Sequence, residues 1–314
     1  MTYSLKSFKA ENAQDAYRQL TDALNKEGIP LESRREMTLE LLNVAVEIEN
    51  PRDRIVPIEQ FKHDFILQET YDILNSNDPR VIHSKQMLEK TMGDSNDPMF
   101  FGNELRQAFS RWSFKKILDR FIKDKNTRKA ILSLGNRRNT KHTPCMIYAH
   151  FIIREDKLYM TAETRGTAVS MGFINDIYFL TLMQEILLGW IQEYYPEVEM
   201  GTFLYKTVSL HEYVDEIVTE NEDDIKYIPI WNQEFKVLNI IEVPFKLSYS
   251  EYIKEMGILY HYIDMYMKAK DQDNLDAGDY ITYDDIENPD KNLFQTEFFY
   301  RWAHTQYIKT QNQR

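Results

Sequence analysis

The sequence predicts an α+β protein in which a mixed β-sheet packs against helices and a long central helix is buried. Three observations lead to this expectation. Helical and strand patterns follow each other without strict alternation, the middle of the chain is rich in strand-forming segments, and residues 177–195 are almost wholly apolar. A doubly wound parallel fold would instead require strands and helices in regular alternation.

The first third of the chain predicts one strand among three helices. Residues 12–26 have the apolar spacing of a helix that ends before Gly28. Residues 38–49 alternate well enough to form a strand with one solvated face. Residues 61–74 and 105–122 place apolar residues at helical spacing, and we expect both helices to pack onto the sheet.

The middle of the chain predicts strands and then the central helix. Residues 129–134, 145–153 and 158–161 have strand composition, and the last two are joined by a turn at Glu155-Asp156. We therefore expect a hairpin. Residues 177–195 follow as a helix that is apolar around most of its circumference, which is typical of a core helix.

The last third predicts one more strand and two helices. Residues 202–210 read as a strand, and residues 249–268 and 294–308 as helices. The acidic stretch 271–290 between the helices is expected to be a solvated loop. No internal repeat or Gly/Ser-rich linker divides the 314 residues, so we expect a single domain.

Charge and hydropathy exclude several classes of partner. The chain has 38 Lys and Arg residues against 50 Asp and Glu residues, a net charge of −12, so we expect no nucleic-acid polymer as a partner. A local basic pocket for one small phosphate is compatible with that total. No signal peptide and no uninterrupted apolar stretch of about 18 residues is visible, because Gln184 and Glu185 interrupt the best candidate. We expect a cytoplasmic protein without a membrane partner.

Cys145 is the single cysteine, which excludes an internal disulfide and a cysteine-cluster metal site. Taken alone, it reads as a small core hydrophobe. Cations nearby would instead favour a reactive thiolate. The preceding segment carries six basic residues: Arg128, Lys129, Arg137, Arg138, Lys141 and His142. The same segment also reads as a solvated basic loop between strands.

Several short motifs, in order from about residue 65 to 214, resemble the thymidylate synthase superfamily. The central one is Pro144-Cys145, followed by a strand with His150, and by Arg165, Gly172 and Asn175-Asp176 before the apolar helix. His211-Glu212-Tyr213 resembles the family's ribose-contacting His-x-Tyr. Upstream, 124–129 resembles its phosphate-binding segment, and Gln68-Glu69 its catalytic glutamate. The resemblance implies a thymidylate synthase-like fold with a core of about 30–214 and an extended part over 215–314.

The resemblance also implies a chemistry. Carbon 5 of a pyrimidine becomes nucleophilic once a thiolate, here from Cys145, adds to carbon 6. The family's electrophile comes from 5,10-methylenetetrahydrofolate, and Glu69 would assist proton transfers. Without the resemblance, Glu69 reads as an exposed helix carboxylate.

The remaining site residues would bind the nucleotide. Arg165, together with Arg128 and Lys129 of a partner subunit, would bind the phosphate, which implies a homodimer. His211 and Tyr213 would contact the ribose and hold its 3′-hydroxyl.

Asp176 decides between branches of the superfamily. Thymidylate synthases carry asparagine there, which both accepts from and donates to uracil. Aspartate accepts from the exocyclic amine of cytosine, and the string Gly172-Phe173-Ile174-Asn175-Asp176 resembles that of cytidylate hydroxymethylases. In isolation, Asp176 reads equally well as the N-cap of the long helix.

The sequence also departs from the family pattern after Arg165. Gly166 and Ala168 replace a phosphate-side serine and a folate-contacting aspartate, and Lys129 replaces an arginine. We expect a cytidylate 5-hydroxymethyltransferase that acts on CMP or dCMP, with no metal. The alternatives are a thymidylate synthase, a cytidylate methylase, or a catalytically inactive nucleotide-binding module.

Overall fold

The computed structural model describes residues 4–33, 36–59, 61, 66, 111–133, 145–218, 225–230, 233–235, 245–270, 287–295 and 297–311. Its strands are β1 (Lys6–Ala10), β2 (Ile29–Ser33), β3 (Glu36–Ile48), β4 (Ile131–Ser133), β5 (Met146–Arg154), β6 (Lys157–Thr164), β7 (Thr167–Ala168), β8 (Glu199–Val218) and β9 (Ile225–Pro229). Its helices are α1 (Ala13–Glu27), α5 (Arg111–Lys123), α6 (Ile174–Ile191), α7 (Tyr249–Lys270) and α8 (Glu297–Gln311), with a π-helical turn η1 (Val169–Phe173) and a 3-10 turn η4 (Lys291–Leu293).

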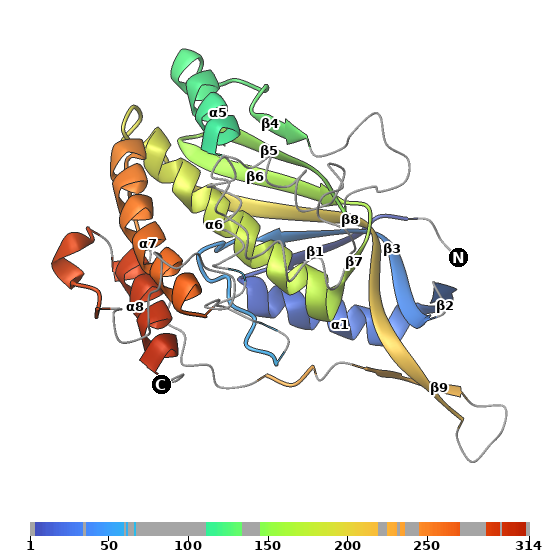
Figure 1. Cartoon of the computed structure of the whole chain (residues 1–314). Helices are drawn as coiled ribbons and strands as arrows, with labels where there is room; N and C mark the ends of the chain where they lie inside the picture. Colours follow the sequence, from blue (N-terminus) through green and yellow to red (C-terminus); the bar gives the residue numbers. More distant parts are fainter. Residues whose placement is uncertain are drawn as a thin grey trace, which may run out of the picture. The chain divides into compact units, whose positions relative to one another are not determined.

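The strands form one mixed sheet, so the predicted α+β class is confirmed. The main path of the sheet runs β1-β3-β8-β6-β5-β4, with β2 beside β3, and β7 and β9 beside β8 (Figure 1). Strand β8 is antiparallel to β3 and parallel to β6, so it lies between both kinds of neighbour. Helices α1 and α6 lie on the same face of the sheet, where the core is built (Figure 1).

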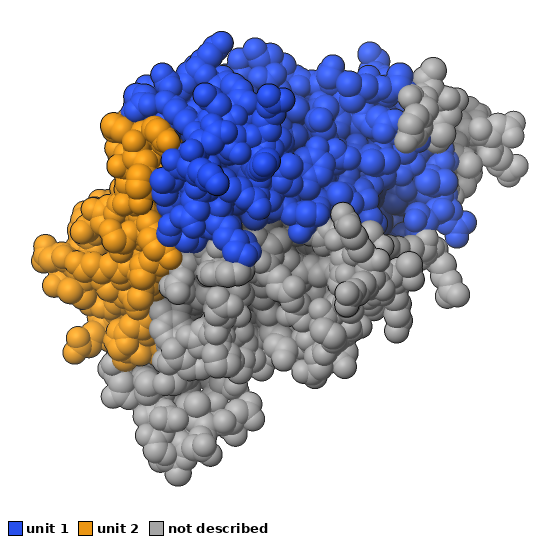
Figure 2. Space-filling model, turned by 90° about the horizontal axis from the view of Figure 1, so that it is seen from above, with its two compact units in different colours: residues 1–188, 197–240 blue, residues 189–196, 241–314 orange. Residues whose placement is uncertain are grey.

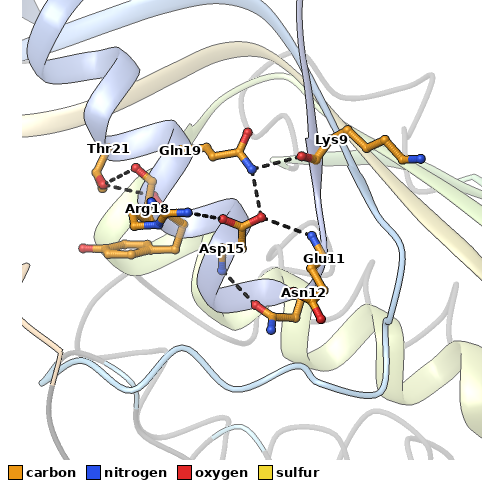
Figure 3. Close-up of polar contacts among 8 residues, drawn as sticks. Lys9, Glu11, Asn12, Asp15, Arg18, Gln19 and Thr21 are labelled. Carbon is orange, nitrogen blue, oxygen red and sulfur yellow. Dashed lines mark hydrogen bonds and ion pairs between the residues drawn. The ribbon is translucent and has the colours of Figure 1, made fainter.

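A polar cap fixes the start of α1 next to the end of β1 (Figure 3). The Asn12 side chain accepts from the backbone N–H of Asp15 at 2.9 Å, and the Asp15 carboxylate accepts from the backbone N–H of Glu11 at 3.1 Å. The pair satisfies the N–H of Asp15 in the first turn of the helix and the N–H of Glu11 just before the N-cap. Gln19 donates to Asp15 and to the Lys9 carbonyl oxygen, so the cap also ties the helix to the strand. The predicted helix 12–26 is confirmed.

Strand β3 confirms the predicted strand 38–49 and explains its broken alternation. Leu39 and Leu41 are buried, and then Val44 and Val46 are buried, so the pattern slips by one residue. Asn43, at the slip, has a φ of 52°, in the left-handed region that asparagine tolerates. The strand therefore kinks there without losing its register to β8.

The predicted hairpin is formed by β5 and β6. Arg154 pairs with Lys157, and the two residues between them, Glu155 and Asp156, have φ values of 49° and 53°. Two positive φ values are the signature of a type I′ turn, whose twist matches that of the strands. The Asp156 carbonyl oxygen then accepts from Glu199 N–H at 2.8 Å, which fixes the start of β8 beside the turn.

Helix α6 is the buried central helix, beginning at Ile174 rather than 177. Among the described residues, Val169–Ile191 is long and apolar enough to span a membrane, and 78% of its apolar 18-residue stretch is buried inside the protein. Its two polar interruptions are buried, and both side chains form hydrogen bonds, although Gln184 Oε1 has no partner among the described residues. The Gln184 amide donates to the Leu158 carbonyl oxygen at 2.8 Å, and Glu185 accepts from Arg52 and Arg54. These pairings are those expected of polar groups in a core.

Several predicted elements differ from the structure in extent. Helix α5 covers the end of the predicted 105–122, whereas nearly all of 61–74 lies outside the described residues. The last two predicted helices correspond to α7 and α8, and most of the acidic stretch is outside the described residues. Strand β8 extends well beyond the predicted 202–210. The sequence did not predict β1, β2, β7 or β9 because they are short strands held by pairing with β3 or β8.

The chain divides into two compact units, residues 1–188 with 197–240 and residues 189–196 with 241–314 (Figure 2). The second unit has its own aromatic core. The Trp190 ring packs against Tyr249, with centroids 4.9 Å apart, and Phe245 stacks on Phe298 at 4.7 Å. Whether the two units fold as the single domain expected from the sequence stays a prediction.

Candidate active site

The C-terminal half of β8 is the framework of the candidate site. Strand β7 runs parallel to it, with Thr167 paired to Leu210 and Ala168 paired to His211. The preceding residue pair, Arg165 and Gly166, is thereby held beside β8. The segment that follows β6 is in this way brought beside the C-terminal half of β8.

Cys145 lies immediately before β5, and Arg165 contacts it. The Arg165 backbone N–H donates to the Cys145 carbonyl oxygen at 2.8 Å, and the guanidinium Nη2 lies 3.6 Å from the sulfur. The cysteine side chain is half-buried and the arginine exposed. A guanidinium at this distance favours the thiolate over the thiol. The pair therefore joins a potential nucleophile to a cation that also suits an anionic ligand.

Asp176 lies in the first turn of α6 and is held by Tyr205 of β8. The Tyr205 hydroxyl donates to Asp176 Oδ2 at 2.6 Å, and it lies 3.3 Å from Thr164 Oγ1. Burial raises the pKa of Asp176 to about 7, while the hydrogen bond from Tyr205 acts in the opposite direction. The carboxyl group can therefore exist in both protonation states near neutral pH. Because α6 begins two residues earlier, Asp176 is not its N-cap.

Tyr205→Phe is expected to raise the pKa of Asp176 further, because it removes a donor that stabilises the carboxylate. One lost hydrogen bond of roughly 1 kcal/mol corresponds to about half a unit to one unit. Carbon-13 NMR titration of aspartate carboxyls, with Asp176→Asn to identify the signal, measures this shift. Tyr159→Phe removes a half-exposed hydroxyl of β6 and is the matched control. An unchanged or lowered titration midpoint in Tyr205→Phe would contradict the assignment.

Gly166, Ser209 and Glu40 meet beside His211. A Cβ atom added to Gly166 would lie 3.5 Å from Ser209 Cβ, an ordinary contact distance. The Ser209 hydroxyl donates to Glu40 Oε1 at 2.5 Å, and Glu40 is the direct cross-strand partner of His211. The His211 and Tyr213 rings lie edge to face, with centroids 5.5 Å apart. This end of the site is lined by hydroxyl, imidazole, phenol and carboxylate groups.

A buried network supports the His-x-Tyr segment from behind. Glu212 is only 1% exposed, and it accepts from the Ser170 hydroxyl of η1 and from the backbone N–H of Tyr213 at 3.1 Å. Burial raises the pKa of Glu212. The Ser170 hydroxyl also lies 3.1 Å from Tyr17 Oη, so α1, η1 and β8 are joined at this point. The network fixes the strand that carries His211 and Tyr213.

Arg128 and Lys129 do not meet Cys145 within one chain. Both are exposed beside β4, where the Ala130 carbonyl oxygen accepts from Phe151 N–H at 2.9 Å. Phe151 lies six residues along β5 from Cys145, a separation of about 20 Å at strand geometry. The two clusters thus lie at opposite ends of one strand. Glu69 lies outside the described residues, and within those residues no cluster of potential metal ligands occurs.

Two residues of this site, Tyr205 and Glu40, were not singled out from the sequence. Both lie in predicted strands, and the predicted alternation alone could have placed Tyr205 on the covered face. Their partners, Asp176 and Ser209, are 29 and 169 residues away along the chain. Only the fold shows these pairs.

No family model matches the chain, but three curated proteins are similar to it. A Methanocaldococcus jannaschii protein named "Putative thymidylate synthase" is 23% identical over 224 residues, which cover 66% of this chain and 90% of that protein. A deoxyuridylate hydroxymethyltransferase of Bacillus phage SP01 is 23% identical over 261 residues, covering 75% and 66% respectively. A Methanothermobacter marburgensis protein, also named "Putative thymidylate synthase", is 26% identical over 195 residues, which cover 58% of this chain and 81% of that protein.

These relatives support the thymidylate synthase superfamily. The observed mixed sheet with its buried helix is consistent with a thymidylate synthase-like fold, and the protein is a one-carbon transferase. The relatives do not support the assignment to the cytidylate branch, which the aspartate at position 176 suggested. Cys145 lies beside Arg165, and Gly166 lies beside Ser209 on the strand that carries His211 and Tyr213. The roles of these residues in catalysis and binding stay predictions.

Proposed function

We propose that the protein is a cytidylate 5-hydroxymethyltransferase, which adds a one-carbon unit from 5,10-methylenetetrahydrofolate, with water, to carbon 5 of CMP or dCMP. The observation that carries the proposal is the Asp176–Tyr205 pair. Cytosine presents an acceptor at nitrogen 3 beside a donor at its exocyclic amine. A protonated carboxyl group matches both, since its O–H donates and its other oxygen accepts. A pKa of about 7 makes that form available at neutral pH.

The same pair assists the covalent step. The Cys145 thiolate attacks carbon 6 and forms a carbon–sulfur bond, while the ring electrons move toward nitrogen 3 and take up the proton of Asp176. The resulting enamine makes carbon 5 nucleophilic. Carbon 5 then gains the one-carbon unit, still attached to tetrahydrofolate, and loses its hydrogen as a proton. The bond between that carbon and the tetrahydrofolate nitrogen would then break, so that protonated tetrahydrofolate leaves and an exocyclic methylene group remains on carbon 5. Hydroxide from water adds to the exocyclic methylene group. The Cys145 thiolate then leaves carbon 6, and nitrogen 3 returns its proton to Asp176, which restores the cytosine ring and the acid. Glu69 is proposed to relay the protons.

Folate would supply the one-carbon electrophile when bound. Ala168 of β7 pairs with His211 of β8. It presents no carboxylate at the position where the resemblance places a folate contact. An acceptor for the pterin amino group must therefore come from another residue, and without one the loss in affinity is about 1–3 kcal/mol. We propose weak but measurable folate binding.

The proposed enzyme is a cytoplasmic homodimer. Arg165 would hold the phosphate together with Arg128 and Lys129 of a second copy, because these two lie too far from Cys145 to serve their own site. The sheet face opposite the helices supports this arrangement: Ile131 of β4 is 43% exposed, and Tyr148, His150 and Ile152 of β5 are half-exposed. His150 Nε2 is buried and unpaired within the described residues, and a second copy could satisfy it.

A uracil nucleotide is the second candidate substrate. Protonated Asp176 can also accept from nitrogen 3–H of uracil and donate to oxygen 4. The similarity to a protein named as a deoxyuridylate hydroxymethyltransferase favours this alternative independently. Cytosine remains our proposal because aspartate, unlike asparagine, can also deliver a proton to nitrogen 3.

Mass spectrometry of CMP, dCMP, UMP and dUMP incubated with protein and methylenetetrahydrofolate tests the function. Hydroxymethylation adds about 30 Da and methylation about 14 Da, as the covalent chemistry requires. A gain of about 30 Da on cytidylates is the expected result. A product only on uridylates, or a gain of about 14 Da, would overturn it. Nucleotide binding with no folate binding and no product would indicate a binding module.

The variant Gly166→Ser with Lys129→Arg is expected to shift preference from CMP toward dCMP. A glycine and a flexible point charge leave more room at the sugar-phosphate end than a serine and a planar guanidinium. Discrimination over one hydroxyl is about 1–3 kcal/mol. The ratio of kcat/KM for the two nucleotides measures it, with Lys123→Arg, an exposed lysine of α5, as control. A strong wild-type preference for dCMP would refute the expectation.

A further inference from the structure

Glu40 of β3 is a half-buried carboxylate at the sugar end of the site, and the chemistry proposed above does not use it. Its Oε1 accepts from the Ser209 hydroxyl at 2.5 Å. In the described part of the chain, no Lys, Arg or His forms an ion pair with it. A carboxylate accepts hydrogen bonds only, and one partly withdrawn from water needs donors. The second oxygen of Glu40 is therefore suited to a donor supplied by a ligand.

The position of Glu40 limits what that ligand group can be. Glu40 lies directly across from His211, whose proposed partner is the 3′-hydroxyl, and cross-strand side chains start about 5 Å apart. A phosphate is negative and would be repelled here. The nearest donor on a ribonucleotide, next to the 3′-hydroxyl, is the 2′-hydroxyl.

Gly166 leaves the space that such a hydroxyl needs. A side chain at 166 would begin 3.5 Å from Ser209 Cβ and 3.8 Å from Ser209 Oγ, the atom that donates to Glu40. A serine there would carry its own hydroxyl into the region of the carboxylate. The missing side chain and the carboxylate are thus complementary features of one subsite.

We propose that Glu40, oriented by Ser209, binds the 2′-hydroxyl of a ribonucleotide and makes the enzyme select CMP over dCMP. This inference rests on the proposed function. Glu40 is a specificity-determining residue in this assignment, because it touches the sugar and not the reacting carbon. The 2′-hydroxyl donates to the free carboxylate oxygen, while Ser209 keeps its bond to the other.

Calorimetric binding of CMP, dCMP and 2′-fluoro-dCMP to the full chain tests the assignment. In wild type, CMP should bind on the order of 10- to 100-fold more tightly than the other two, the range for a hydrogen bond to a charged group. The 2′-fluoro analogue should follow dCMP because fluorine does not donate. In Glu40→Ala the three affinities should converge, with that for dCMP nearly unchanged. Glu40→Gln should fall between.

Two comparisons separate this role from a structural one. Glu36→Gln, an exposed carboxylate on the same strand, should keep the wild-type ratio. In the Gly166→Ser background, Glu40→Ala should no longer change the ratio of the affinities for CMP and dCMP. The reason is that the new serine hydroxyl already donates a hydrogen bond to the carboxylate. Equal losses for all three nucleotides in Glu40→Ala, or equal wild-type affinities for CMP and dCMP, would overturn the inference. Failure of folded wild type to bind any pyrimidine nucleotide would overturn the proposed function instead.

Discussion

Cys145→Ser is expected to abolish exchange of the carbon 5 hydrogen of the nucleotide into solvent, while nucleotide binding stays nearly intact. Exchange requires the covalent adduct at carbon 6, and a serine hydroxyl is a far weaker nucleophile than a thiolate. The loss should be on the order of 1,000-fold or more, as for other nucleophile replacements. Arg165, whose Nη2 lies 3.6 Å from the sulfur, is unchanged in this variant, and we expect it to keep its proposed contact with the phosphate.

The assay follows tritium release from 5-tritiated CMP and dCMP, with calorimetry for binding. Arg165→Lys keeps a cation but loses the fixed guanidinium, so it should weaken binding and exchange together. Cys145→Ser should lose exchange alone. Exchange by Cys145→Ser at the wild-type rate would rule out covalent catalysis by this residue.

Asp176→Asn is expected to move base preference from cytosine toward uracil by about 1–3 kcal/mol. Asparagine retains an acceptor and gains a permanent donor that suits oxygen 4, but it cannot give a proton to nitrogen 3. The ratio of kcat/KM for cytidylate and uridylate pairs measures this shift. Asp215→Asn, an exposed residue of the same β8 strand, is the control. Identical ratios in wild type and Asp176→Asn would refute the role in base selection.

The same substitution should stabilise the fold at alkaline pH. The pKa of Asp176 is about 7 in the folded protein and 3.8 as the reference. A carboxyl with a raised folded pKa binds its proton more tightly in the native state, so stability falls as pH rises from about 4 to 7. Asparagine avoids this loss. Asp176→Asn should therefore be about 1–3 kcal/mol more stable than wild type at pH 8 and equal to it near pH 4. Urea denaturation at both values measures the difference, and a destabilised variant at pH 8 would contradict it.

Local sequence patterns predicted most of the helices and strands, whereas the way in which these pack together depends on strand pairing in the sheet. Helix α1 has its cap and apolar stripe in one short stretch, and the β5–β6 hairpin has both strands next to its turn, so both could be predicted. Strands β1 and β2 are short and could not, because each is stabilised by pairing with β3.

The site shows the same division. Cys145 and Arg165 stand out as residue types, and hairpin pairing brings them together across twenty residues. Glu40 carries no comparable signal, since an acidic residue in a half-solvated strand is ordinary. Its proposed role depends on its hydrogen bond with Ser209, 169 residues later, and on the space left by the absent side chain of Gly166.

Because β8 lies in the middle of the sheet, deuterium exchange of its backbone amides is expected to report the affinity for a nucleotide. Residues 203–207 are paired to β3 on one side and β6 on the other, and Leu210 and His211 to β3 and β7. Such amides exchange with deuterium only when the whole sheet opens. Saturating nucleotide should therefore slow them by the factor 1 + [L]/Kd, about 100-fold at 100 times Kd, whatever the catalytic state of the protein. The edge strand β2, exposed along its length, should exchange through local opening and keep its rate. A bound nucleotide that left the β8 rates unchanged would show that these amides open locally.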